Sequence, residues 1–204
     1  YSYNVTPRTS IIGINNNLSE SQLLGTVAHE YHHAAQNDYI SDYLPGAEKW
    51  NYEGSARWIG NEVKAAHPEV PGDDYWDLAI SSPPRNGAGN YMLAPWNGFV
   101  EGYDAFIYFY FLANNNNEAF TAQRRNVVRV FWEQLGALND FTKWEQAFDE
   151  ATKNAPNYKS FEKSYQGFSR ANLFKDTWYP RGNEITKATQ VNVDLKQKDE
   201  EISA

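Results

Sequence analysis

The sequence contains no cysteine among its 204 residues and only one methionine. Disulfide bonds and thiolate metal sites are therefore excluded, which leaves histidine and carboxylate as the strong metal ligands of this chain. Basic residues are in the minority, because 18 Lys and Arg stand against 26 Asp and Glu and give a net charge of −8. This balance argues against a nucleic acid or an anionic membrane surface as the main partner.

Long apolar runs are also missing. The longest, residues 106–113, is far shorter than the ~20 residues that a membrane-spanning helix needs. Hydrophobic residues nevertheless make up 41% of the chain, as in ordinary globular proteins, and its length suits one domain with a sizeable core. The sequence starts at Tyr1 without a signal-peptide pattern, and we interpret it as a mature or trimmed part of a longer protein.

The clearest local pattern predicts a helix over Ser19–Asn37. Ser19 and Gln22 are three residues apart and form a capping-box pattern at its start. Apolar residues then recur at three- and four-residue steps and predict the core-facing side of this helix, namely Leu24, Ala28, Tyr31 and Ala35.

Three of the four histidines of the chain lie in one five-residue stretch of this predicted helix, residues 29–33. Two of them form the pattern His29-Glu30-x-x-His33. Side chains four residues apart lie one above the other on a helix, so both imidazoles can point at one metal ion. Glu30 is placed beside them, where its carboxylate can reach a water molecule on that metal. The alternative is a helix with incidental histidines, and His32 is expected at the surface or behind the ligands.

A third ligand is available on the next predicted helix, over residues 48–66, which ends before Pro68. Its Glu53 lies twenty residues after His33, far enough for a loop and a returning helix. Two histidines and a glutamate with one open position are the arrangement of a catalytic zinc rather than a structural one. Taken alone, Glu53 would be interpreted as an exposed helix carboxylate.

The motif HEYHH, followed after nineteen residues by EGSA, resembles the gluzincin group of zinc metallopeptidases. The resemblance covers residues 19–61, under a quarter of the chain. It implies a zincin-like fold in which His29, His33 and Glu53 bind zinc and Glu30 acts on the water. The pattern W-x-x-E-G-x-A is similar to that of zinc aminopeptidases with a thermolysin-like domain.

Two features differ from that pattern. Thermolysin-like enzymes carry an acidic residue four positions after the glutamate ligand, where it orients a ligand histidine, but Arg57 stands there in this chain. The group that supports the ligand histidines must therefore be a different one. The sequence also lacks the G-x-M-E-N pattern by which aminopeptidases recognise a substrate amine, which weakens an aminopeptidase interpretation.

Residues 67–100 are rich in Pro, Gly and Asp and are predicted to form an irregular lid or cleft wall. Aromatic residues in it either line a subsite or anchor the segment to the core: Tyr75, Trp76, Tyr91 and Trp96. His67 is expected at the surface, and the pair Asp73-Asp74 is a weak signal for calcium. Many peptidases of this type stabilise the oxyanion with a Tyr or His; Tyr103 or Tyr91 is our candidate, and a packed core tyrosine is the alternative.

The expected fold is mainly α (α+β): a zincin-like domain over residues 1–185 with a small N-terminal sheet and a helical C-terminal half. The sheet is predicted from the apolar residues at 11–14, as a substrate-pairing strand or a simple edge strand. Residues 186–204 are predicted as a final strand or a linker stub. Further helices are predicted over residues 101–113, 118–135, 140–153 and 158–175, and the first of them is central to the core.

Together these patterns predict zinc-dependent hydrolysis of a peptide or protein substrate, with Glu30 as the general base. One alternative is a non-catalytic zincin-derived module that binds peptide or glycan through its aromatic residues. Another is a zinc hydrolase that acts on a non-peptide amide. The base Glu30 and the three ligands His29, His33 and Glu53 are all present, which favours an enzyme over a non-catalytic module. Seven Trp and fourteen Tyr without cysteine are typical of a secreted, extracellular enzyme.

Overall fold

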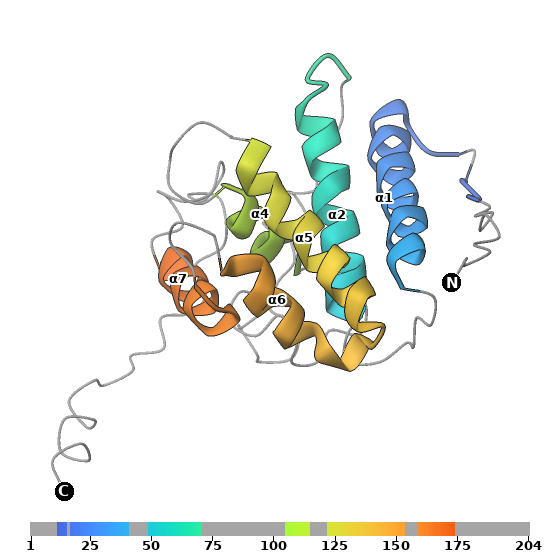
Figure 1. Cartoon of the computed structure of the whole chain (residues 1–204). Coiled ribbons are helices and arrows are strands. Elements are labelled where there is room, and N and C mark those ends of the chain that lie inside the picture. Colours follow the sequence, from blue (N-terminus) through green and yellow to red (C-terminus); the bar gives the residue numbers. More distant parts are fainter. Residues whose placement is uncertain are drawn as a thin grey trace, which may run out of the picture.

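A computed structural model describes residues 12–15, 17–40, 49–70, 105–114, 122–153 and 159–173 of the chain (Figure 1). Within these ranges the regular structure is helical and contains no strand, which confirms the mainly α prediction. The predicted N-terminal sheet finds no support, because residues 12–15 are not in a strand. Instead, Asn15 Oδ1 accepts a hydrogen bond from the backbone N–H of Asn17, a local bond that turns the chain toward the first helix. Residues 186–204 lie outside the described ranges.

The first helix, α1 (Glu20–Tyr39), begins where the capping box predicts. Ser19 Oγ accepts the backbone N–H of Gln22 at 3.3 Å, and Gln22 Oε1 accepts the backbone N–H of Ser19 at 3.0 Å. The predicted core-facing side is wrong for Tyr31, which is 70% exposed. The buried residues of α1 are polar or small: Ser21, Gly25, His29 and Gln36. The helix therefore packs through the side that carries a candidate ligand, and not through an apolar stripe.

The partner of that side is α2 (Lys49–Ala65), which runs beside α1 in the opposite direction (Figure 1). Whereas α1 buries polar and small residues, α2 also reaches the aromatic core. On its other side α2 contacts α4 (Phe106–Asn114), and through Trp50 it enters the aromatic core. Glu53 is thus carried by an element fixed from both sides.

Four further elements complete the described part of the chain: α5 (Ala122–Leu138), η3 (Phe141–Lys143), α6 (Trp144–Thr152) and α7 (Phe161–Leu173). They agree with the helices predicted over residues 118–135, 140–153 and 158–175. The helix α5 contacts α1, α4 and α6, while α7 contacts α4 and α6. The helix α4 is central to the core, as its sequence predicts, because its residues 106–113 are all buried except Tyr110.

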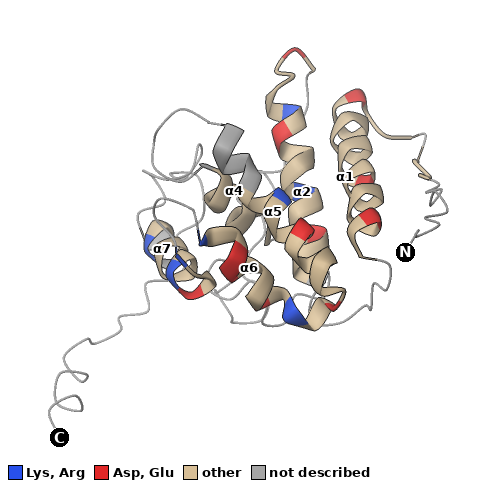
Figure 2. Cartoon of the chain, in the orientation of Figure 1, with Lys and Arg blue, Asp and Glu red and all other residues tan. Residues whose placement is uncertain are grey.

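Aromatic side chains form most of this core. Phe148 of α6 stacks on Phe131 of α5, with 3.9 Å between ring centroids, and on Trp50 of α2 at 5.9 Å. The helix α4 carries no charged residue (Figure 2), and the hydroxyl of its Tyr108 meets Ser164 Oγ at 2.6 Å. Among the described residues, no helix combines the length and apolar character needed to span a membrane. The aromatic core contacts α2 through Trp50 and so helps to position Glu53, three residues further along this helix.

Candidate metal centre

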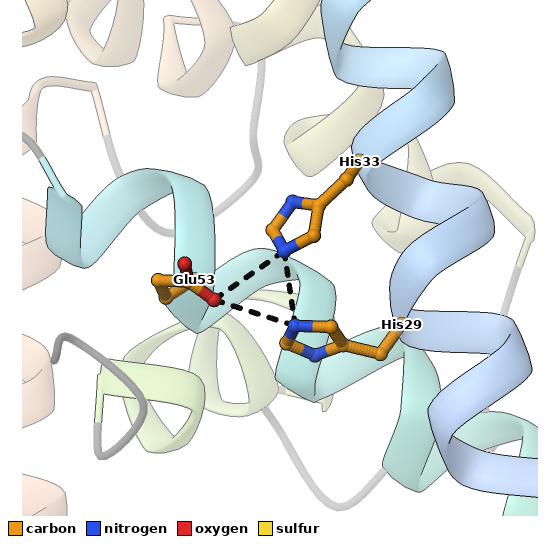
Figure 3. A group of neighbouring side chains, drawn as sticks. All are labelled: His29, His33 and Glu53. Atoms are coloured by element: carbon orange, nitrogen blue, oxygen red, sulfur yellow. Dashed lines mark hydrogen bonds and ion pairs between the residues drawn. The ribbon is translucent and has the colours of Figure 1, made fainter. Parts of the chain in front are cut away.

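Three side chains converge between α1 and α2: His29 and His33 from α1, and Glu53 from α2 (Figure 3). The Nε2 atoms of the two histidines lie 2.9 Å apart, and each lies 3.3 Å from Oε2 of Glu53. Ligand atoms at about 2.0–2.1 Å from a tetrahedral zinc-like ion are about 3.3–3.4 Å from each other. The triangle is close to this size, so the three residues could hold one metal ion. They are the three residues selected from the sequence.

The electrostatics of the site also suit a cation. Glu53 Oε2 is buried, and it lies 3.3 Å from one ring nitrogen of each imidazole. Burial alone would raise the pKa of Glu53, but the interactions with His29 and then with His33 outweigh it and lower this pKa to about 2. The carboxylate is therefore ionised at neutral pH. A buried negative charge beside two imidazoles is stabilised by a bound cation.

The imidazole of His33 is held by two neighbours. Its Nδ1 lies 2.7 Å from Oε1 of Gln36, one turn further along α1, and its ring stacks on Tyr52 with 4.1 Å between centroids and 9° between planes. Gln36 is 1% exposed. No sequence motif pointed to this residue. Its one local signal is its position three residues after His33, which places it on the same side of the helix.

Glu30, the predicted base, follows His29 directly and is turned by about 100° around the helix axis. It is half-buried, and it makes no hydrogen bond or ion pair with any described residue. Its carboxylate is therefore not consumed by a structural contact. The other candidates for catalysis or binding in the segments 71–104, including Tyr91 and Tyr103, lie outside the described residues.

His32 has a different role from the two candidate ligands. Its Nε2 lies 3.3 Å from Ser55 Oγ, and its ring meets the indole of Trp132 edge-on at 6.5 Å. Burial, followed by the charges on His33 and His29, lowers the pKa of His32 to about 3, so the ring is neutral at physiological pH. It lies behind the ligands, one of the two positions expected for it, and links α1 to α2 and α5.

The fourth histidine, His67, lies just beyond the end of α2 and is exposed, as the sequence predicts. Its Nδ1 pairs with Oε1 of Glu69 at 2.9 Å. This local pair accounts for the lowered pKa of Glu69, to which the hydrogen bond with His67 contributes most. His67 therefore forms a surface contact, distinct from the candidate metal centre.

Comparison with protein-family models, with characterised proteins and with solved structures found no match to this chain. The function of the candidate centre is accordingly argued from its own geometry and chemistry.

Proposed function

We propose that this protein is a zinc metallopeptidase of the gluzincin type, with a zincin-like fold and a metal held by His29, His33 and Glu53. One observation carries the proposal: two imidazole nitrogens and one ionised carboxylate oxygen meet within 3.3 Å of each other. Such a donor set suits zinc and leaves one tetrahedral position for water or substrate. Bound zinc would supply Lewis acidity, which polarises a carbonyl group and acidifies water.

Glu30 is the residue proposed to move the proton. As a water oxygen attacks the carbonyl carbon of the peptide bond, the Glu30 carboxylate accepts a proton from that water. It then delivers the proton to the leaving nitrogen as the C–N bond breaks, so one water molecule is consumed and an amine and a carboxylic acid are formed. Its position next to His29 and its lack of contacts with the described residues support this role.

The substrate class is proposed to be a peptide or protein outside the cell. The order of the four groups along the chain supports peptide hydrolysis, because His29, Glu30, His33 and Glu53 occur in the gluzincin order and spacing. Their geometry supports one joint site, since α1 and α2 present the three ligand atoms to each other from opposite sides (Figure 3).

A digestion experiment tests the proposal. The purified protein is analysed for metal by mass spectrometry, and then incubated with casein and with a peptide library, with and without 1,10-phenanthroline. We expect about one zinc ion per chain, cleavage that stops with the chelator, and recovery on adding zinc.

Two results would contradict the peptidase assignment. Zinc binding without any cleavage would identify a non-catalytic module that binds peptide or glycan. Release of amine from a small amide panel, without cleavage of peptides, would identify a hydrolase of non-peptide amides.

A further inference from the structure

Gln36 occupies a buried position between the two ligand-bearing helices. Its side-chain oxygen faces Nδ1 of His33 at 2.7 Å. Its side-chain nitrogen donates to the backbone carbonyl of Tyr52 at 3.0 Å and to Ser55 Oγ at 2.8 Å. Tyr52 and Ser55 flank Glu53 on α2. One side chain therefore connects a ligand of α1 to the turn of α2 that carries the third ligand.

The orientation of the Gln36 amide follows from its partners. A backbone carbonyl can only accept a hydrogen bond, so the group that faces Tyr52 O must be the NH₂. Ser55 Oγ gives its own proton to the backbone carbonyl of Asn51 at 2.8 Å, which leaves lone pairs for Gln36. Reversing the amide would place oxygen against oxygen at Tyr52 and leave a buried acceptor without a donor.

This orientation determines the proton position on His33. Because Gln36 presents Oε1 to Nδ1 of His33, that nitrogen must carry the hydrogen. In the neutral ring, Nε2 then has a free lone pair. This lone pair is directed at Glu53 Oε2 and at Nε2 of His29, the position where a metal would bind.

We infer that Gln36 is the positioning residue of this centre: it holds His33 in the Nδ1–H tautomer and fixes His33 relative to the helix that carries Glu53. The inference rests on the proposed metal site, but not on peptide cleavage. In this chain a neutral amide on the ligand helix does what an acidic side chain does in other histidine–metal sites.

The neutral amide has a chemical consequence. A carboxylate partner would make the imidazole of His33 more basic and strengthen its bond to a metal, whereas an amide oxygen is a weaker acceptor. Gln36 also needs its NH₂ group for α2, which a carboxylate cannot replace. We therefore expect orientation of His33 and the connection between the helices to be separable by substitution.

The experiment measures zinc affinity by chelator competition in three variants. Gln36→Met removes both functions at similar volume, Gln36→Glu keeps an acceptor for His33 but loses the donors, and Thr152→Val removes an unrelated buried hydrogen bond on α6. We expect Gln36→Met to weaken zinc binding about 10- to 100-fold, as is typical for an outer partner of a ligand histidine. Gln36→Glu should lose less zinc affinity than Gln36→Met, because it keeps the acceptor for His33, and Thr152→Val should bind zinc as tightly as the parent protein.

A second measurement uses the unmodified protein, so it stands if the variants fail to fold. Long-range ¹H–¹⁵N spectra of the zinc-loaded chain report which ring nitrogen of His33 carries hydrogen. A proton on Nδ1 is expected, and a proton on Nε2 would overturn the inference. Equal loss of zinc affinity in Gln36→Met and Gln36→Glu would also overturn it, because the residue would then only connect the helices. Zinc binding is measured without substrate, so failure to cleave peptides leaves these results unaffected.

Discussion

Gly54 of α2 lies directly against Ala105, at the start of α4. A Cβ atom on Gly54 would lie 2.8 Å from the Cβ of Ala105 and 3.1 Å from its backbone carbonyl carbon. The two chain segments therefore approach each other as closely as they do only because residue 54 has no side chain. Since Gly54 follows Glu53, this contact also sets how far the candidate ligand projects toward α1.

Replacing Gly54 by alanine should therefore disturb both stability and the centre. Backbone atoms of Ala105 cannot move aside as a flexible side chain can, so Gly54→Ala should lower the free energy of unfolding by about 1–3 kcal/mol. It should also weaken zinc binding through displacement of Glu53. Thermal unfolding with and without zinc measures both effects. Gly13→Ala is the matched control, because a Cβ there meets nothing within 4 Å. An unchanged melting temperature in Gly54→Ala would show that α2 and α4 have room to separate.

Replacing Glu30 by glutamine should separate catalysis from metal binding. The amide has the shape of the carboxylate but cannot accept the proton of the attacking water, so kcat should fall about 10²- to 10⁴-fold. Zinc content should stay as in the parent protein, because Glu30 is not among the three converging residues. The control is Glu20→Gln, an exposed change on the same helix. Retained cleavage activity in Glu30→Gln would remove this residue from the mechanism.

Glu53 should be required for stabilisation by zinc. A ligand that binds only the folded chain stabilises it by about 2.7 kcal/mol at a free concentration of 100 times its Kd. For a chain of this size, that corresponds to a rise in Tm of roughly 5–10 °C. Glu53→Gln should lose most of this rise, whereas Glu145→Gln, an exposed change on α6, should keep it. The same zinc-induced rise in both variants would exclude Glu53 as a ligand.

Tyr110 of α4 should limit stability at alkaline pH. Burial, and then the charge on Glu62, raise the pKa of Tyr110 to about 12, while an unfolded tyrosine titrates near 10. Above pH 10 the tyrosine of the unfolded chain loses its proton while Tyr110 of the folded chain keeps it. Deprotonation therefore stabilises the unfolded state relative to the folded state, and the free energy of unfolding should fall between about pH 10 and pH 12. Tyr110→Phe should show a shallower fall in urea unfolding measured across this range. Tyr31→Phe removes the same group from an exposed position. If the slopes of Tyr110→Phe and the parent protein agree, Tyr110 does not contribute.

The prediction of α1 shows both the reach of sequence patterns and where they fail. Its start depends on two side chains three residues apart, a local relationship that survives in any surroundings. Its inward side could not be predicted, because periodicity selects apolar residues such as Tyr31, whereas the structure buries Ser21 and Gln36. Gln36 becomes buried because α2 supplies a close neighbour and the hydrogen-bond partners that offset the cost of burial.

The support of His33 could not be predicted for a related reason. The resemblance to thermolysin-like enzymes leads one to expect an acidic supporting residue four positions after Glu53, but Arg57 stands there, so the sequence left the support of His33 open. In the structure the supporting atom comes from Gln36 on the other helix. A glutamine three residues after a histidine is a common pattern and does not by itself predict a supporting role. That role depends on the acceptors that α2 provides for the NH₂ group of Gln36, the Tyr52 carbonyl and Ser55 Oγ. The predicted N-terminal strand is not supported in residues 12–15, where Asn15 instead bonds to the backbone N–H of Asn17.

Sequence patterns alone predicted the relationships that lie within a single helix: the cap of α1, the alignment of His29 with His33, and the place of Glu30 beside them. These follow from helical geometry over one or two turns. The approach of Glu53 to both imidazoles at 3.3 Å, and the contact of Gln36 with His33, depend instead on how α1 and α2 pack together. A separation of twenty residues along the sequence leaves the position of Glu53 relative to His33 open, and the packing of α2 against both α1 and the aromatic core selects one position.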